Sequence, residues 1–188
     1  RLFKANINIP KIYKGDKSQG LILMSDLGKD KYLDILNKET LYCLYTDAID
    51  CLYKMQNNAD KIGLKEFDKL EQINEMKLFD EWFLNKHLKI NLSREKQEQL
   101  HQCYSHIYSI ILKIPKTFVH RDFHSRNLMV TSKNNPGVLD YQDAVIGPLT
   151  YDIVSLLKDC YITWEDETIY SMASSYFAKI EKDHNIVY

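Results

Sequence analysis

The chain has 188 residues, which is enough for one domain with a hydrophobic core. Its 25 Lys and Arg residues nearly balance its 26 Asp and Glu residues, so the totals predict no basic face and argue against nucleic acid as a partner. No apolar run is long enough to span a bilayer and no signal-peptide pattern opens the chain, so we expect no membrane partner.

Two short apolar runs stand near the start of the chain. Residues 9–13 and 20–24 read as strands, and the turn residues between them predict a hairpin. Residues 25–28 end this hairpin.

Helical periodicity dominates the middle of the chain. Apolar residues recur every three or four positions over residues 40–55, which predicts an amphipathic helix with Thr40 near its N-cap. Residues 66–88 repeat this pattern. Ser93 is placed to cap a further helix over residues 94–112, which Pro115 stops.

Short runs of β type follow, separated by polar loops. They cover residues 117–120, 128–131 and 138–141. Two more helices are predicted over residues 151–158 and 165–182. A small β part, a helical body and short strands that carry loops indicate an α+β chain that is mostly helical.

The four cysteines are widely spaced, at Cys43, Cys51, Cys103 and Cys160. None belongs to a Cys-x-x-Cys pair, so a metal cluster is not expected. Three of them lie in patterns that read as helical and apolar, which predicts buried free thiols in a reducing cytosol.

Polar residues are most concentrated in residues 120–127, His-Arg-Asp-Phe-His-Ser-Arg-Asn, between two apolar runs. Thirteen residues after Asn127 comes Asp140, at the end of the next β run. A lone His-Arg-Asp is most simply a solvated turn with a strand-end cap nearby. The added Asn127 and Asp140 at these offsets favour a kinase signature instead.

Phosphoryl transfer requires this kind of residue set. A carboxylate must hold the acceptor hydroxyl in line with the γ-phosphorus, and oxygen ligands must hold Mg²⁺ across the triphosphate. Asp122 suits the first role, and Asn127 and Asp140 suit the second because Mg²⁺ prefers hard oxygen donors. His124, two residues after Asp122, is placed to point at the transferring phosphate.

Residues 118–130 and 136–162 resemble the aminoglycoside phosphotransferase and choline kinase superfamily, and within it the bacterial N-acetylmuramate/N-acetylglucosamine 1-kinases. Residues 75–83 resemble that family's substrate-side helix. The resemblance implies an α+β, protein-kinase-like fold, with the end of the N-lobe and the hinge in residues 1–28 and a mostly helical C-lobe in residues 29–188. It also implies a cytoplasmic enzyme of cell-wall recycling that uses ATP and Mg²⁺ to phosphorylate the anomeric hydroxyl of an N-acetyl amino sugar.

The resemblance also implies roles for single residues. Asp122 becomes the catalytic base, assisted by His124, while Asn127 and Asp140 become the metal ligands. The family more often has an acidic residue where Ser25 stands, but only backbone groups of the hinge are expected to pair with adenine. The hinge residues are Ser25, Asp26 and Leu27.

Support and substrate residues follow from the same resemblance. Asp152 resembles the buried Asp that supports the catalytic loop, a role shared with His120, and a carboxylate at the start of a helix is also favoured by the helix dipole. Asp143 is a candidate for metal support, sugar contact or loop support. Glu81 and Trp82 either grip a sugar or are an exposed Glu beside a core Trp, two interpretations that we weigh equally.

Kinases of this kind also need a Gly-rich phosphate loop, a strand lysine and a helix glutamate, and the sequence shows none of them. We therefore expect residues 1–188 to be a fragment that lacks most of the N-lobe and some C-terminal helices, and that need not be active alone. Two alternatives are a kinase of another small alcohol, such as an aminoglycoside or choline, and an inactive pseudokinase or binding fragment. The intact Asp122, Asn127 and Asp140 argue against the second.

Overall fold

The hydrophobic core forms around one long helix, α2 (Leu41–Asn58). In the computed structural model, which describes residues 1–184, one face of α2 packs against α5 (Tyr151–Leu157), α6 (Asp166–His184) and strand β3 (Lys116–Val119). The apolar periodicity that predicted this helix therefore marks its buried face. Its buried apolar residues are Leu41, Leu44, Tyr45, Ala48, Ile49, Cys51, Leu52 and Met55.

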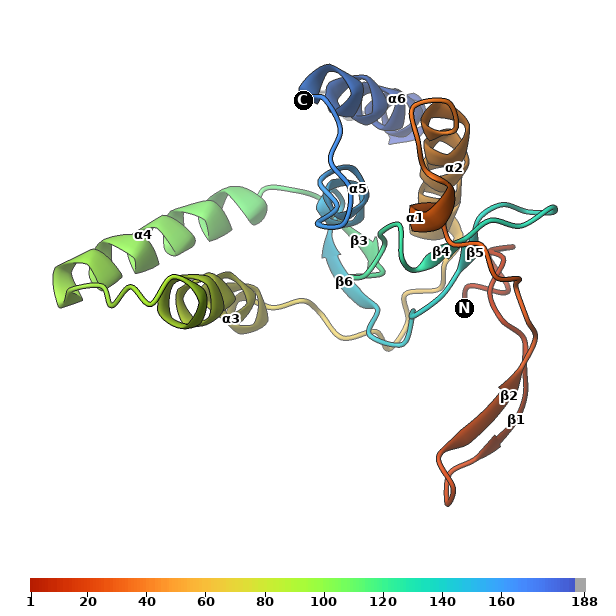
Figure 1. Cartoon of the computed structure of the whole chain (residues 1–188), viewed down its shortest axis with the longest axis horizontal. Coiled ribbons are helices and arrows are strands. Elements are labelled where there is room, and N and C mark those ends of the chain that lie inside the picture. The colour runs from red at the N-terminus through yellow and green to blue at the C-terminus, as the bar shows by residue number, and fades with distance from the viewer. Residues whose placement is uncertain (185–188) are drawn as a thin grey trace.

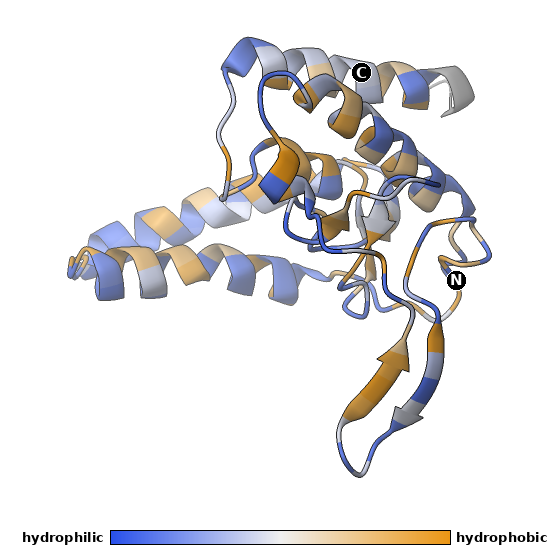
Figure 2. Cartoon of the chain, turned by 45° about the vertical axis from the view of Figure 1, so that its right-hand side comes forward, coloured by the Kyte–Doolittle hydropathy of each residue, from blue (hydrophilic) through white to orange (hydrophobic). Residues whose placement is uncertain are grey.

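The predicted N-terminal hairpin is confirmed, with a shifted first strand. Strands β1 (Ile12–Asp16) and β2 (Leu21–Met24) pair antiparallel, and a register shift lies between Ile12 and Lys14. The first strand starts three residues later than predicted. The hairpin projects from the body (Figure 1), and its apolar second strand is exposed to solvent (Figure 2).

The predicted helix over residues 66–88 consists of two different helices. Asp68 caps α3 (Lys69–Leu78) by accepting a hydrogen bond from the Glu71 N–H at 2.9 Å. The chain then continues as a π-helix, η1 (Phe79–His87), a rare form that is often found at functional sites. A 3.6-residue apolar pattern does not distinguish the two forms, so the sequence predicted one continuous helix.

Helix α4 (Arg94–Ile111) is capped by Ser93, as predicted, and the Ser93 hydroxyl accepts a hydrogen bond from Lys96 N–H at 3.4 Å. It packs on α3, and this pair of helices extends away from the body on the side opposite the hairpin (Figure 1). Thr40 is the N-cap residue of α2, as predicted. Its hydroxyl makes no capping hydrogen bond and donates instead to the Ile35 carbonyl, at the end of the short α1 (Tyr32–Ile35), at 2.8 Å.

Two small antiparallel sheets hold the loop at residues 120–127. Strand β3 pairs with β6 (Val145–Pro148), and β4 (Leu128–Met129) pairs with β5 (Gly137–Val138). The sequence did not predict β6, because Gly147 and Pro148 are poor strand formers. Gly147 suits this strand because an added Cβ would lie 3.2 Å from the Val119 side chain.

The prediction of buried cysteines is wrong for three of the four. Cys51 is buried in the core, whereas the other three are exposed free thiols. Cys43 and Cys103 lie on α2 and α4, where they face solvent. None of the helices within residues 1–184 is both long and apolar enough to cross a membrane.

A pair of identical substitutions tests where the core lies. Leu52 is 0% exposed in the core, whereas Leu70 on α3 is 67% exposed. We expect Leu52→Ala to lower the free energy of unfolding by about 2–5 kcal/mol, because it removes buried methyl groups and leaves a cavity. Leu70→Ala should change it by no more than about 0.5 kcal/mol. Urea unfolding followed by circular dichroism measures both, and equal effects would contradict this placement of the core.

Candidate active site

Residues 120–127 form the catalytic loop, and a buried carboxylate binds the backbone at its start. Asp152, in the first turn of α5, accepts hydrogen bonds from the N–H groups of His120 at 2.7 Å and Arg121 at 3.1 Å. Its side chain is fully buried. Since α5 belongs to the hydrophobic core, the start of the loop is fixed to the core.

A second buried carboxylate holds the other end of the catalytic loop. Asp159, just past the end of α5, accepts hydrogen bonds from the N–H groups of Ser125 and Tyr161, both at 2.9 Å. No sequence pattern indicated a role for Asp159. Its neighbours Lys158 and Cys160 form no motif, and only the family-like string over residues 136–162 drew attention to this stretch.

The structure brings Asp122, Asn127 and Asp140 together. The Asn127 side-chain amide donates to the Asp122 carbonyl at 3.1 Å, and Leu139 N–H donates to the Asn127 carbonyl at 2.9 Å, which places Asp140 beside Asn127. The Asp122 N–H donates to Nδ1 of His120 at 3.2 Å. The Asp122 carboxylate itself accepts no hydrogen bond from any residue that the structure describes, so it is available to a ligand.

The oxygen atoms of this cluster suit Mg²⁺. Because the Asn127 Nδ2 group is used by Asp122, its Oδ1 atom is left for a cation. Asp140 is exposed and accepts one hydrogen bond, from Gln142 at 2.6 Å. Residues 1–184 hold no group of three or more His, Cys, Asp or Glu side chains fit for a metal. One carboxylate and one amide oxygen are nonetheless typical for Mg²⁺, which takes its remaining ligands from phosphates and water.

His124 is held by its surroundings on one side. The His124 ring lies edge-on to the Tyr161 ring, with the ring centres 5.4 Å apart. The Arg126 guanidinium lies 4.8 Å from the centre of the same Tyr161 ring. The His124 Nδ1 atom is buried and has no hydrogen-bond partner within residues 1–184. Its predicted role toward a phosphate stays a prediction.

The hinge residues line a pocket of about 330 Å³ that also includes Leu139, the residue before Asp140. The Ser25 N–H donates to the Lys11 carbonyl at 2.9 Å, and the Gly28 N–H donates to the Asp26 carboxylate at 2.8 Å. The peptide groups of Asp26 and Leu27 bond to no other described residue, so they remain available to a planar ligand. The pocket is lined by Pro10, Met24, Ser25, Asp26, Leu27, Gly28, Met129 and Leu139.

No hydrogen bond joins a candidate substrate residue (Glu81, Trp82 or Asp143) to the catalytic loop within residues 1–184. Glu81 accepts a hydrogen bond from Lys86 at 2.9 Å, and the same ammonium group lies 3.5 Å from the centre of the Trp82 ring. Trp82 is 57% exposed, so it does not belong to the core formed by residues 1–184. Asp143 is exposed. Their roles toward a sugar stay predictions.

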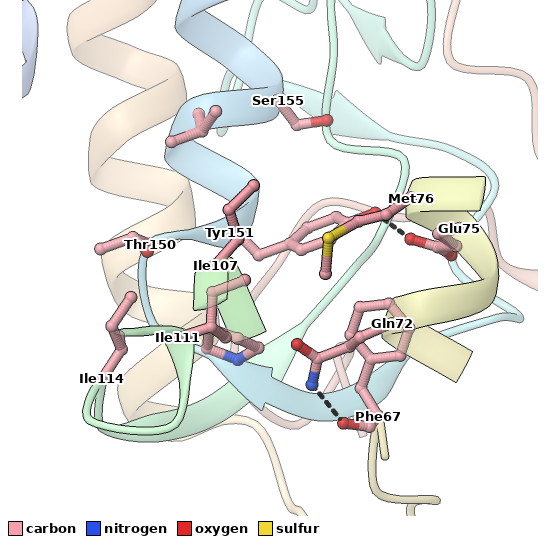
Figure 3. Close-up of a pocket in the computed structure, with 12 residues that line it drawn as sticks. Phe67, Gln72, Glu75, Met76, Ile107, Ile111, Ile114, Thr150, Tyr151 and Ser155 are labelled. Atoms are coloured by element: carbon pink, nitrogen blue, oxygen red, sulfur yellow. Dashed lines mark hydrogen bonds between the residues drawn. The ribbon is translucent and has the colours of Figure 1, made fainter. Parts of the chain in front are cut away.

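One residue of the preceding helix, α3, does reach the catalytic loop. Glu75 on α3 forms an ion pair with Arg121 and accepts a hydrogen bond from the Tyr151 hydroxyl at 3.1 Å. Glu75 and Tyr151 also line a largely apolar pocket of about 410 Å³ between α3, α4 and α5 (Figure 3). Glu75 lies in the segment that resembles the substrate-side helix, but no sequence pattern indicated a role for it.

Burial changes the pKa of the two groups at the start of the catalytic loop. It raises the pKa of Asp152 to about 7, even though the N–H groups of His120 and Arg121 favour its charged form. Burial lowers the pKa of His120 to about 4. Asp152 is therefore mostly neutral below a pH of about 7, and His120 is mostly neutral above a pH of about 4.

The fold around this loop is that of the kinase-like phosphotransferases. It is similar to a streptomycin–ATP ternary complex of APH(2")-IIa, with a TM-score of 0.65 at 18% identity over 94% of this chain and 62% of that one. It is also similar to a choline/ethanolamine kinase family protein from Mesorhizobium loti, with a TM-score of 0.65 at 13% identity over 94% of this chain and 57% of that one. These likenesses confirm the predicted fold class.

Residues 1–181 match the Phosphotransferase enzyme family (APH), and the chain belongs to it. It is 36% identical to the N-acetylmuramate/N-acetylglucosamine kinase of Pseudomonas aeruginosa over 176 residues, which are 93% of this chain and 52% of that protein. It is also 36% identical to the enzyme of that name from Neisseria meningitidis, over 92% of this chain and 53% of that protein. The chain thus spans about half the length of the curated relatives it matches.

The opposite pKa shifts of Asp152 and His120 predict two cancelling effects of pH on stability. The raised pKa of Asp152, from 3.8 to about 7, gives stability that is lost as the pH rises toward 7. The lowered pKa of His120, from 6.5 to about 4, gives stability that is lost as the pH falls toward 4. Each slope is about 1.4 kcal/mol per pH unit, so the two oppose each other between these limits.

Single variants should expose each slope separately. We expect the unfolding free energy of Asp152→Asn to rise with pH between 4.5 and 6.5 relative to the unsubstituted chain, and that of His120→Asn to fall. Urea unfolding in buffers across this range gives both slopes. Parallel pH profiles for the three proteins would show that neither group titrates as these environments require.

Proposed function

We propose that the protein containing this chain transfers the γ-phosphoryl group of ATP, with Mg²⁺, to the anomeric hydroxyl of an N-acetyl amino sugar. The proposal covers the whole protein, of which residues 1–188 supply the hinge and a mostly helical C-lobe. It assigns the reaction to the cytoplasm, where ATP is available, and to the recycling of cell-wall sugars.

The observation that carries this proposal is the state of Asp122. Its backbone is bonded on both sides, to His120 and to Asn127, while its carboxylate is partly exposed and accepts no hydrogen bond from the described residues. A carboxylate that is fixed in place and left unpaired is suited to accept the proton of an attacking hydroxyl. Holding that hydroxyl in line with the γ-phosphorus is the main task in phosphoryl transfer.

The nucleotide has a matching place beside this group. The free peptide groups of Asp26 and Leu27 suit the edge of an adenine ring, and Leu139 forms part of the same pocket directly before Asp140. Asn127 and Asp140 would hold Mg²⁺, which neutralises charge on the phosphates when it is bound. The proposed order along the cleft is therefore adenine at the hinge, phosphates at Asp140, and the acceptor at Asp122.

The acceptor is proposed from the relatives named above, which act on N-acetylmuramate and N-acetylglucosamine by their names. An anomeric hydroxyl is more acidic than an ordinary alcohol, so a carboxylate base has less to do and positioning can dominate. Glu81, Trp82 and Asp143 are the proposed contacts to the sugar, and His120 and Asp152 are the proposed supports of the loop. His124 is proposed to face the transferring phosphate.

Two variants separate the proposed base from the proposed metal ligand. In the complete protein, Asp122→Asn should lower kcat by about 10²–10⁴-fold and leave the KM for ATP nearly unchanged, because the group acts on the acceptor. Asp140→Ala should instead raise the Mg²⁺ concentration needed for half-maximal rate. Steady-state kinetics with titrated Mg²⁺ measures both, and normal turnover in Asp122→Asn would refute its assignment.

A panel of acceptors tests the position of phosphorylation. The complete protein should consume ATP with N-acetylmuramate and N-acetylglucosamine, and not with their 1-O-methyl glycosides, because the methyl group blocks the acceptor oxygen. Kanamycin and choline complete the panel, with product detected by phosphorus NMR. Phosphorylation of the methyl glycosides, or a clear preference for kanamycin or choline, would contradict the anomeric assignment and leave a phosphotransferase of another alcohol.

A further inference from the structure

The Glu75 carboxylate joins three elements that are far apart in the sequence. One oxygen pairs with the Arg121 guanidinium of the catalytic loop. The other oxygen accepts the hydrogen bond of the Tyr151 hydroxyl on α5, which Figure 3 shows. The Glu75 and Arg121 side chains are both 32% exposed, so solvent screens this pair only in part. Within residues 1–184, this is the only side-chain hydrogen bond from α3 or η1 to the catalytic loop.

Arg121 needs support because its backbone is strained. Its φ of 78° lies in the left-handed region, where a residue with a long side chain is rarely stable. The Arg121 N–H is held by Asp152 at 3.1 Å, and its guanidinium lies 5.2 Å from the centre of the Phe67 ring. The ion pair with Glu75 completes this fixation. Because Asp122 is the next residue, the backbone conformation of Arg121 sets the direction of the Asp122 carboxylate.

From these contacts we infer that Glu75 is a positioning residue, which aligns Asp122 through Arg121 and links the substrate-side helix to the catalytic loop. The inference rests on the proposed function only in naming Asp122 as the base. Helix α3 continues directly into η1, which carries Glu81 and Trp82. An acceptor that contacts η1 therefore contacts the same continuous helical segment that holds the base in place.

Kinetics of the complete protein tests this role. Glu75→Gln should lower kcat for the sugar by about 10–100-fold, since a small misplacement of a reacting group has effects of this size. The KM for ATP should change by less than about threefold, because the hinge pocket is untouched. Glu98→Gln on α4, which removes an exposed ion pair to Arg94, is the matched control and should keep the original kcat.

Two further variants separate positioning from general stability. Glu75→Asp keeps the charge but shortens the side chain, so it should lose the simultaneous contact to Arg121 and Tyr151 and reduce kcat as Glu75→Gln does. The double variant with Arg121→Gln and Glu75→Gln should have the same kcat as Arg121→Gln alone, because both substitutions break the same ion pair. Full multiplication of the two effects, or an unchanged kcat in either Glu75 variant, would overturn the inference.

Hydrogen exchange gives a readout that does not depend on the acceptor. Mass spectrometry of peptides that cover residues 118–128 should show faster amide exchange in Glu75→Gln than in Glu98→Gln at equal global stability. If the protein phosphorylated no sugar in the panel, the proposed function would fail, while faster exchange would still support the positioning role. Equal exchange in the two variants would overturn the positioning role whatever the substrate.

Discussion

The geometry of the site depends on a carboxylate buried beneath the catalytic loop. Asp152 is fully buried, yet it accepts two backbone hydrogen bonds from the start of the loop. A buried acceptor without partners would destabilise the fold, so the two N–H groups of His120 and Arg121 must stay where Asp152 needs them. The same hydrogen bonds therefore satisfy the core and fix the residues next to Asp122.

Helix α5 holds the loop at both ends. Asp152 lies in its first turn, and Asp159 lies two residues after its last residue, Leu157. The two carboxylates bind the loop at two points, because Asp152 accepts the N–H groups of His120 and Arg121 while Asp159 accepts that of Ser125. The middle of the loop is thereby held without any direct contact to the Asp122 carboxylate, which stays free for chemistry.

The sequence predicts those features that depend on local pattern, and it misses those that depend on contacts across the fold. The period of α2 and the spacing of Asp122, Asn127 and Asp140 are local, so the core helix and the polar cluster could be predicted. The pairing of Glu75 with Arg121 joins residues 46 positions apart and has no sequence pattern. The exposure of Cys43 and the strand at Gly147 likewise depend on which face a neighbouring element covers.

Two residues of the proposed site have left-handed backbone conformations: Asp140, a proposed metal ligand, and Arg121, which directly precedes the proposed base. Asp140, with a φ of 61°, tolerates this conformation because its short polar side chain bonds nearby, here to Gln142. Arg121, with a φ of 78°, has no such local compensation. Strain of this kind costs about 1–3 kcal/mol and persists only where the surroundings hold it. At Arg121 the surroundings are Asp152 from the core and Glu75 from the substrate-side helix, so loss of either contact should relax the backbone directly before Asp122.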